Sequence, residues 1–225
     1  EINYHHINNK TIYELIDSKI RKKELKKGDI FTYTALNNER IRIENLLQNN
    51  GYYKFSKDLI YIQADSTRDK LINLKILLKE VTNDSLIYEK FNINKIFIHI
   101  DGKKESQDTT LYKGYSFITS KNKKLDFNRD IITELIRIKI NNLYSKKETE
   151  NTYRNLSNLK FFKKILIEFV ELKKRRNLNC NIYVETPTKM YYSIEAEAKR
   201  RKIHHWTVRW SPFTRYNRNY GLDGL

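Results

Sequence analysis

One short succession of features occurs twice along the chain, and this repeat limits the possible folds more than any other feature. Residues 46–53 (LLQNNGYY) and 155–162 (NLSNLKFF) each resemble the end of a helix followed by a pair of aromatic residues. Alternating apolar residues, typical of strands, follow in both places. A recurring supersecondary unit predicts two related modules. Two unrelated α+β domains with ordinary hairpins are the alternative that periodicity leaves open.

The first half of the chain predicts the order strand, helix, helix, strand, strand. We expect a short strand at residues 2–6 and helices at 11–22 and 34–50, where apolar residues recur at helical spacing. Gly51 would end the second helix in the left-handed conformation that C-terminal caps favour. Alternating apolar residues on both sides of a turn at 65–69 then predict a hairpin.

The second half predicts the same order. A strand at 96–100 is followed by a polar stretch with Gly114 and an extended piece at 115–118. Two helices follow, one that begins at Asn128 and carries Ile131, Leu135 and Ile138, and another at 147–160. The last two strands contain Ile165, Ile167 and Phe169, and then Leu178, Cys180, Ile182 and Val184. Each aromatic pair, including Tyr52 and Tyr53, would hold the second helix of its module against the sheet.

These elements predict an α+β fold of tandem β-α-α-β-β modules, each with two helices packed on a three-stranded mixed sheet. We expect one module at residues 1–90, a second at 91–190, and an atypical basic tail at 191–225. Glu1 is neither an initiator methionine nor the start of a signal segment, so we expect an internal or processed piece.

A formal net charge of +17 would ordinarily indicate a polyanionic partner such as nucleic acid. Outside a basic cluster at 199–218, however, lysines alternate with acidic and amide residues, as on solvated surfaces. A basic α+β nucleic-acid-binding module is the alternative function. The order of the predicted elements argues against it, since RNA-binding sheets of this size interleave helices with strands.

No catalytic, metal or cofactor site is predicted. The sequence has no Gly-rich phosphate loop, HExxH or Cys-x-x-Cys motif. Cys180 is the single cysteine and lies in the apolar phase of a strand, so we expect a small buried residue and not a nucleophile. Adjacent histidines on a strand point to opposite faces, which argues against metal binding by His5, His6, His204 and His205. Ordinary capping is expected of Asp101, Asp126 and Asp130.

Several runs of residues resemble the polypeptide-transport-associated (POTRA) domains of BamA/TamA-like outer-membrane proteins. In the first half these are residues 35–47, Gly51-Tyr52-Tyr53-Lys54-Phe55 and 60–65. In the second half they are residues 128–140, Tyr144-Ser145, Thr152-Tyr153, Phe161-Phe162-Lys163, 167–169 and 180–187. The resemblance covers about residues 1–190, and the second half is similar to the last such domain before the membrane barrel.

The resemblance implies a periplasmic arm, attached to the outer membrane in the intact protein, that needs no cofactor. Its partners would be unfolded outer-membrane protein clients and periplasmic or outer-membrane accessory proteins, with membrane contact only through a barrel absent from this chain. Residues 191–197 would begin that barrel, but residues 198–225 lack the alternation of a barrel strand. A frameshift is one hypothesis for this departure.

Client binding in such a module is expected at a sheet edge, by addition of an extended client strand. The family resemblance implies that the strand after the second helix is this edge. The nominated docking residues are therefore Leu59, Ile60, Tyr61, Ile62 and Gln63 in the first module, and Ile165, Leu166, Ile167, Glu168 and Phe169 in the second. The alternative is that the neighbouring module covers these edges.

Overall fold

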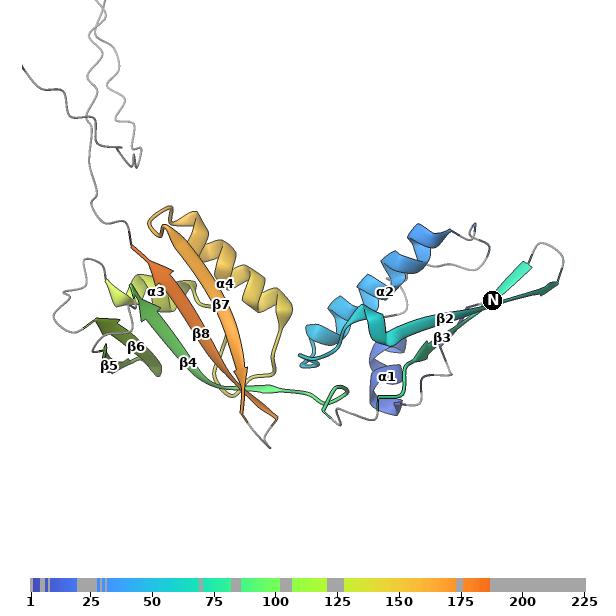
Figure 1. The fold of residues 1–225 in the computed structure, drawn as a ribbon, viewed down its shortest axis with the longest axis horizontal. Helices are drawn as coiled ribbons and strands as arrows, with labels where there is room; N and C mark the ends of the chain where they lie inside the picture. Colours follow the sequence, from blue (N-terminus) through green and yellow to red (C-terminus); the bar gives the residue numbers. More distant parts are fainter. Residues whose placement is uncertain are drawn as a thin grey trace, which may run out of the picture.

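The computed structural model contains two modules, each built of helices packed on one face of a sheet (Figure 1). It describes residues 2–4, 7, 9–19, 28, 30, 32–68, 71–81, 86–101, 107–120, 128–172 and 176–186. The predicted α+β class is confirmed. The division of the chain at residues 90 and 91 stays a prediction, and the basic tail at 191–225 lies outside the described residues.

The first module has the predicted order of elements. These are β1 (Ile2–Asn3), α1 (Lys10–Ser18), α2 (Tyr33–Gln48), the 3-10 helix η2 (Lys57–Leu59), β2 (Ile60–Arg68) and β3 (Leu71–Leu78). β3 is the central strand, with β1 parallel on one side and β2 antiparallel on the other. This sheet is the three-stranded mixed sheet expected from the sequence.

Side-chain caps and apolar faces account for the two helices of the first module. The Asn9 side chain accepts a hydrogen bond from the Ile12 N–H at 3.1 Å, and Thr32 accepts one from the Ala35 N–H at 3.1 Å. The apolar faces of both helices meet the sheet in one core, which contains Ile12, Ile16, Ile43, Leu47, Tyr52, Phe55, Ile60 and Ile76.

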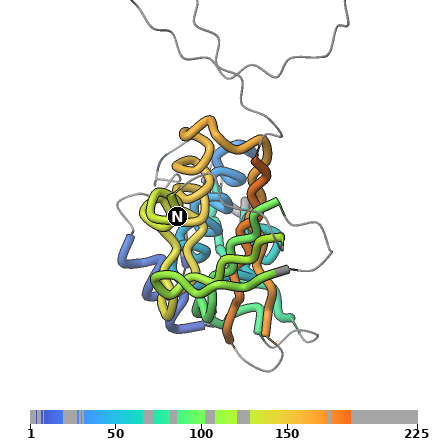
Figure 2. Tube along the Cα trace, turned by 90° about the vertical axis from the view of Figure 1, so that its left-hand side faces the viewer, coloured from blue at the N-terminus to red at the C-terminus, as the bar shows by residue number. Residues whose placement is uncertain are grey.

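The second module contains seven elements. They are β4 (Asn92–Ile100), β5 (Gln107–Tyr112), β6 (Tyr115–Ser120), α3 (Arg129–Leu135), α4 (Lys146–Asn158), β7 (Lys164–Glu171) and β8 (Asn177–Glu185). The sheet order is β5-β6-β4-β8-β7. β7 and β8 run side by side in the orange part of the trace (Figure 2) and pair antiparallel.

This second sheet has five strands, where the sequence predicted three. β5 and β6 form a hairpin whose turn residues, Lys113 and Gly114, have φ of 49° and 83°, as a type I′ turn requires. β6 also pairs with β4 in parallel, so the hairpin lengthens the sheet on that side. Residues 107–110 (QDTT) have no apolar alternation, which is why the pattern predicted only a polar stretch there.

The first helix of the second module is shorter than predicted. α3 ends at Leu135, and Ile136 already has extended φ and ψ of −75° and 116°. Residues 137–139 belong to no helix, and the Arg137 N–H donates to the Thr152 hydroxyl at 2.9 Å. Ile136 and Ile138 are both buried. Ile138 is therefore buried from outside the helix, and the helical spacing of Ile131, Leu135 and Ile138 was misleading.

The interior strand β8, between β4 and β7, carries the predicted buried row. Leu178, Cys180, Ile182 and Val184 are at most 1% exposed and face the helices. Burial raises the pKa of the Cys180 thiol to about 12, so this thiol stays protonated at neutral pH. The prediction that Cys180 is a small buried residue is confirmed.

Candidate functional site: two open strand edges

β2 and β7 each lie at the end of a sheet, so one side of each strand has no neighbouring strand among the described residues. The nominated residues 60–63 belong to β2, and 165–169 belong to β7. Leu59 is a correction, because it ends the 3-10 helix η2 and precedes the strand. The topology thus puts the other nominated residues on edge strands, while their role in docking stays a prediction.

The register of β7 identifies the backbone groups that face its free edge. The Leu172 N–H donates to the Asn177 carbonyl at 3.0 Å, immediately after the strand ends. Because paired residues alternate in an antiparallel ladder, Leu166, Glu168 and Val170 direct their backbone groups toward β8. The N–H and C=O groups of Ile165 and Ile167, and likewise of Phe169, therefore point away from the sheet. These groups are the hydrogen-bonding edge of the second module.

The same reasoning applies to β2. The Lys79 N–H donates to the Leu59 carbonyl at 2.8 Å, which assigns Tyr61 and Gln63 to the bonds with β3. The backbone groups of Ile62 and Ala64 face the free edge. The usable edge is short, because the ladder is irregular between Asp65 and Arg68.

Apolar and charged side chains both line β7. Ile165, Ile167 and Phe169 face the helices and are half-buried against the core. On the opposite, helix-free face, Leu166 and Val170 are 41% and 51% exposed. The exposed Glu168 lies between them on this face, so two apolar side chains flank a carboxylate there. Val170 lies one residue beyond the nominated range, and its alternation with Leu166 was the signal that could have included it.

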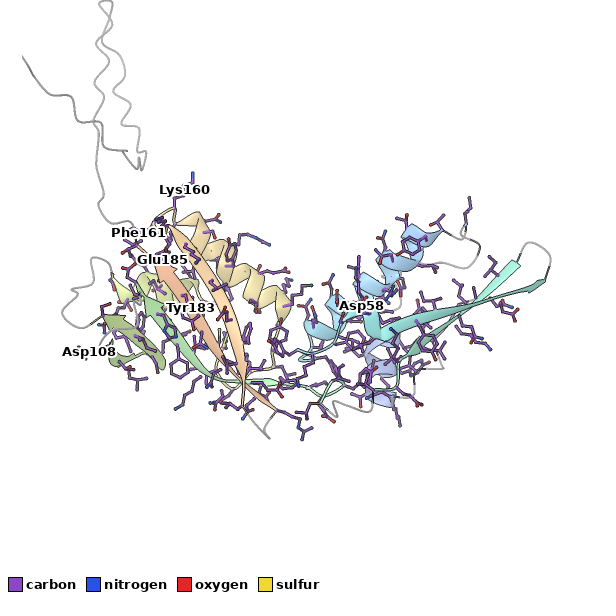
Figure 3. The ribbon with its side chains drawn as sticks, viewed as in Figure 1. Asp58, Asp108, Lys160, Phe161, Tyr183 and Glu185 are labelled. Atoms are coloured by element: carbon purple, nitrogen blue, oxygen red, sulfur yellow. The ribbon has the colours of Figure 1, made fainter. Side chains whose placement is uncertain are left out.

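Charged side chains mark the two ends of β7. Lys164 lies 3.9 Å from Glu185 on β8, and Glu171 forms an ion pair with Lys54 of the first module at 2.8 Å. Figure 3 labels Glu185 on β8 and, in the first module, Asp58 in the 3-10 helix before β2. Glu168 lies between these pairs and is exposed.

The first module contacts the second directly, through residues at the C-terminal end of α2. The Tyr53 ring lies among Phe91, Tyr144 and Phe169, with ring centroids at 5.9, 5.0 and 5.8 Å. Tyr52, its neighbour, is 2% exposed in the core of its own module. The sequence predicted that both rings hold α2 on its own sheet, and for Tyr53 this is corrected: the ring packs into the core of the second module.

Hydrogen bonds reinforce this contact. The Asn49 side-chain oxygen accepts from the Lys147 N–H at 2.7 Å, so a residue of the first module caps the N-terminus of α4. Lys146 donates to the Asn45 side chain at 3.0 Å, and the Gly51 carbonyl accepts from the Phe91 N–H at 2.9 Å. The neighbouring module therefore contacts β7 at its C-terminal end, at Phe169 and Glu171.

Burial changes the acidity of the rings at this contact. It raises the pKa of Tyr144 to about 12, with smaller contributions from the nearby Tyr53 and Glu150. Burial also raises the pKa of Tyr53, assisted by Glu171 and opposed by Lys54. Both phenols are neutral at physiological pH and act as apolar packing groups.

The other singled-out side chains have structural roles or are not described. Asp101 accepts from the Thr186 N–H at 2.6 Å and from the Thr186 hydroxyl. Asp130 lies in the first turn of α3, where it accepts a hydrogen bond from the Tyr112 hydroxyl at 2.9 Å and contacts the Lys113 ammonium group. Residues not described by the structure are Asp126, His5, His6, His204 and His205. Across the described ranges, no three His, Cys, Asp or Glu residues are grouped as metal ligands would be.

Comparisons with known proteins agree with the fold. A scan against protein-family models found no match, and a search of curated protein sequences found none either. Among solved structures, BamA of Haemophilus ducreyi lacking POTRA domains 1–3 matches 83% of this chain, with a TM-score of 0.57 and 11% identity. This chain covers 29% of that BamA chain. The likeness confirms the predicted POTRA fold.

Two further matches have lower TM-scores and carry no argument by themselves. BamA POTRA3–5 of Haemophilus influenzae matches 78% of this chain and is covered over 54% of its own length, at a TM-score of 0.46 and 11% identity. POTRA1–3 of the periplasmic domain of Omp85 from Anabaena matches 84%, with 63% of its length covered, at 0.37 and 12% identity. In the part of this chain that is described, no helix has the length and apolar character needed to cross a membrane.

Proposed function

We propose that this chain is the periplasmic polypeptide-binding arm of an outer-membrane β-barrel assembly or translocation protein. The fold supports the proposal, because the POTRA-like modules align with a BamA that lacks POTRA domains 1–3. The chain spans 29% of that protein, so a barrel, outer-membrane attachment and partners among accessory proteins are parts of the proposal. No catalytic step or cofactor is involved.

The open edge of β7 is the observation that carries the proposal. An extended client segment pairs with the outward N–H and C=O groups of Ile165, Ile167 and Phe169, and so adds a sixth strand beyond β7. Main-chain pairing accepts many sequences, which suits a protein that handles diverse unfolded clients. The shorter edge at Ile62 and Ala64 of β2 supplies a second place of the same kind.

Substituting Ile167 by proline tests this edge. Proline removes the outward N–H donor that a client strand would use, whereas the bonds between β7 and β8 involve the neighbouring residues. NMR titration of the full chain with unfolded outer-membrane-protein peptides should show shifts along β7 in the wild type and their loss in I167P. Ile167→Ala, which loses side-chain volume but keeps the N–H, should retain the peptide-induced shifts.

Two outcomes would contradict the proposal. Unchanged peptide capture by a folded I167P variant, checked by its melting temperature, rules out the β7 edge. A single-stranded RNA oligomer at physiological salt serves as the competing ligand, since basic and aromatic surfaces bind RNA bases and phosphates. Shifts produced by the RNA alone would replace the proposal by the nucleic-acid alternative.

A further inference from the structure

The exposed face of β7 has a pattern of its own. Leu166, Glu168 and Val170 point to the helix-free side, with the carboxylate between two exposed apolar side chains. Their neighbours across the pair with β8 are Tyr183, Asn181 and Asn179. None of these neighbours carries a positive charge.

Glu168 differs from the other carboxylates nearby. Glu171 is paired with Lys54 at 2.8 Å, and Glu185 is near Lys164 at 3.9 Å. Within the described ranges, no lysine, arginine or histidine forms an ion pair with Glu168. The Glu168 carboxylate therefore stands at the middle of the open edge with its charge unbalanced.

An added strand brings its own side chains beside these three. In a sheet, residues directly opposite one another lie on the same face with Cβ atoms about 4.5–5.5 Å apart, and opposite charges at such positions attract. The side chain opposite Glu168 thus shares a face with those opposite Leu166 and Val170. The resulting client pattern, apolar–x–basic–x–apolar, is the same in both chain directions.

We infer that the β7 edge prefers client strands that carry a lysine or arginine opposite Glu168, with apolar residues two positions away on either side. This inference rests on the proposed function and deepens it by naming the class of client. Backbone pairing supplies the general affinity, and the carboxylate supplies a preference among clients and a choice of register.

Three capped peptides of about nine residues, an ordinary strand length, test the preference on the full chain. All three alternate valine and threonine, and they differ only in a central lysine, glutamine or glutamate. Since a cross-strand ion pair contributes up to about 1 kcal/mol, the lysine peptide should bind about two- to fivefold more tightly than the glutamine peptide at low salt. The difference should shrink at about 1 M salt, where exposed charges are screened.

Variants assign the preference to one residue. Glu168→Gln should abolish the difference between the lysine and glutamine peptides, and Glu168→Lys should make the glutamate peptide the tightest. Asp108→Asn is the matched control, because it removes one exposed carboxylate from β5 at the opposite end of the same sheet (Figure 3). This control should keep the wild-type preference.

The outcomes separate the inference from the proposed function. If all three peptides bind with equal affinity, the inference is overturned while client binding stands, and Glu168 is then a charge that discourages pairing between edges of different molecules. If none of the peptides binds, the proposed function itself fails at this edge. A preference that survives in E168Q also overturns the inference.

Discussion

At the scale of single residues, the position of Gly51 requires both a left-handed backbone conformation and the absence of a side chain. Its φ is +102°, a left-handed value that glycine adopts at little cost. A Cβ atom at this place would lie 3.0 Å from Leu143 Cδ2 and 3.2 Å from Lys90 Cβ. The residue thus has to end α2 and also allow the segment before β4 and the loop before α4 to approach closely.

We expect Gly51→Val to destabilise the fold. The left-handed backbone costs a residue with a side chain about 1–2 kcal/mol, and the close contacts add to this. Gly28→Val is a matched control, because Gly28 also has a positive φ, +93°, but a Cβ atom there would meet nothing within 4 Å. Thermal unfolding should show a larger decrease in Tm for G51V than for G28V. An unchanged Tm in G51V would contradict the assigned cap.

At the scale of elements, the sequence predicted the helices and strands whose apolar residues all face the core of their own module. α2, α4 and the alternating strands β7 and β8 were predicted close to their observed bounds. β5 was missed because a strand at the end of a sheet can carry polar residues on both faces. The packing of Tyr53 against the second module was missed for a different reason. The rings around it belong to residues 91, 144 and 169, and no local sequence pattern connects these positions to Tyr53.

The start of α4 provides a prediction at this scale. Asn49→Ala removes the side-chain acceptor of the Lys147 N–H, and loss of such a cap costs about 1 kcal/mol. Hydrogen exchange at the first turn of α4 should become faster, although Asn49 belongs to the first module. Asn158→Ala, at the exposed last position of α4, is the control and should leave these amides unchanged. Equal exchange rates in N49A and the wild type would show that the cap is dispensable.

At the scale of the whole molecule, the contact around Tyr53 joins the two cores. An aromatic ring, an ion pair and four hydrogen bonds between described residues lie between the C-terminal end of α2 and the second module. We therefore expect the two modules to tumble in solution as one body. The edges of β2 and β7 would then keep a fixed distance and direction relative to each other.

Tyr53→Ala should uncouple the modules. Replacing a buried aromatic residue by alanine costs about 3–5 kcal/mol, and Tyr53 is only partly buried, so the cost should be at or below the lower end of this range. NMR relaxation should report one overall correlation time for the wild type and two different ones for Y53A. Tyr53→Phe keeps the ring and should behave as the wild type. A single correlation time in Y53A would contradict the joining role.

The cap on α4 also bears on the order in which the chain acquires its structure. Chains emerge from the ribosome with the amino end first, and domains generally fold as units in that order. Asn49 and Tyr53 are therefore made about a hundred residues before α4 and β7, and they directly follow a helix, α2, that can already be folded. The first module can therefore serve as a folded template on which the second module completes its structure. If the contacts between the modules are lost during synthesis, folding of the second module should suffer more than folding of the first.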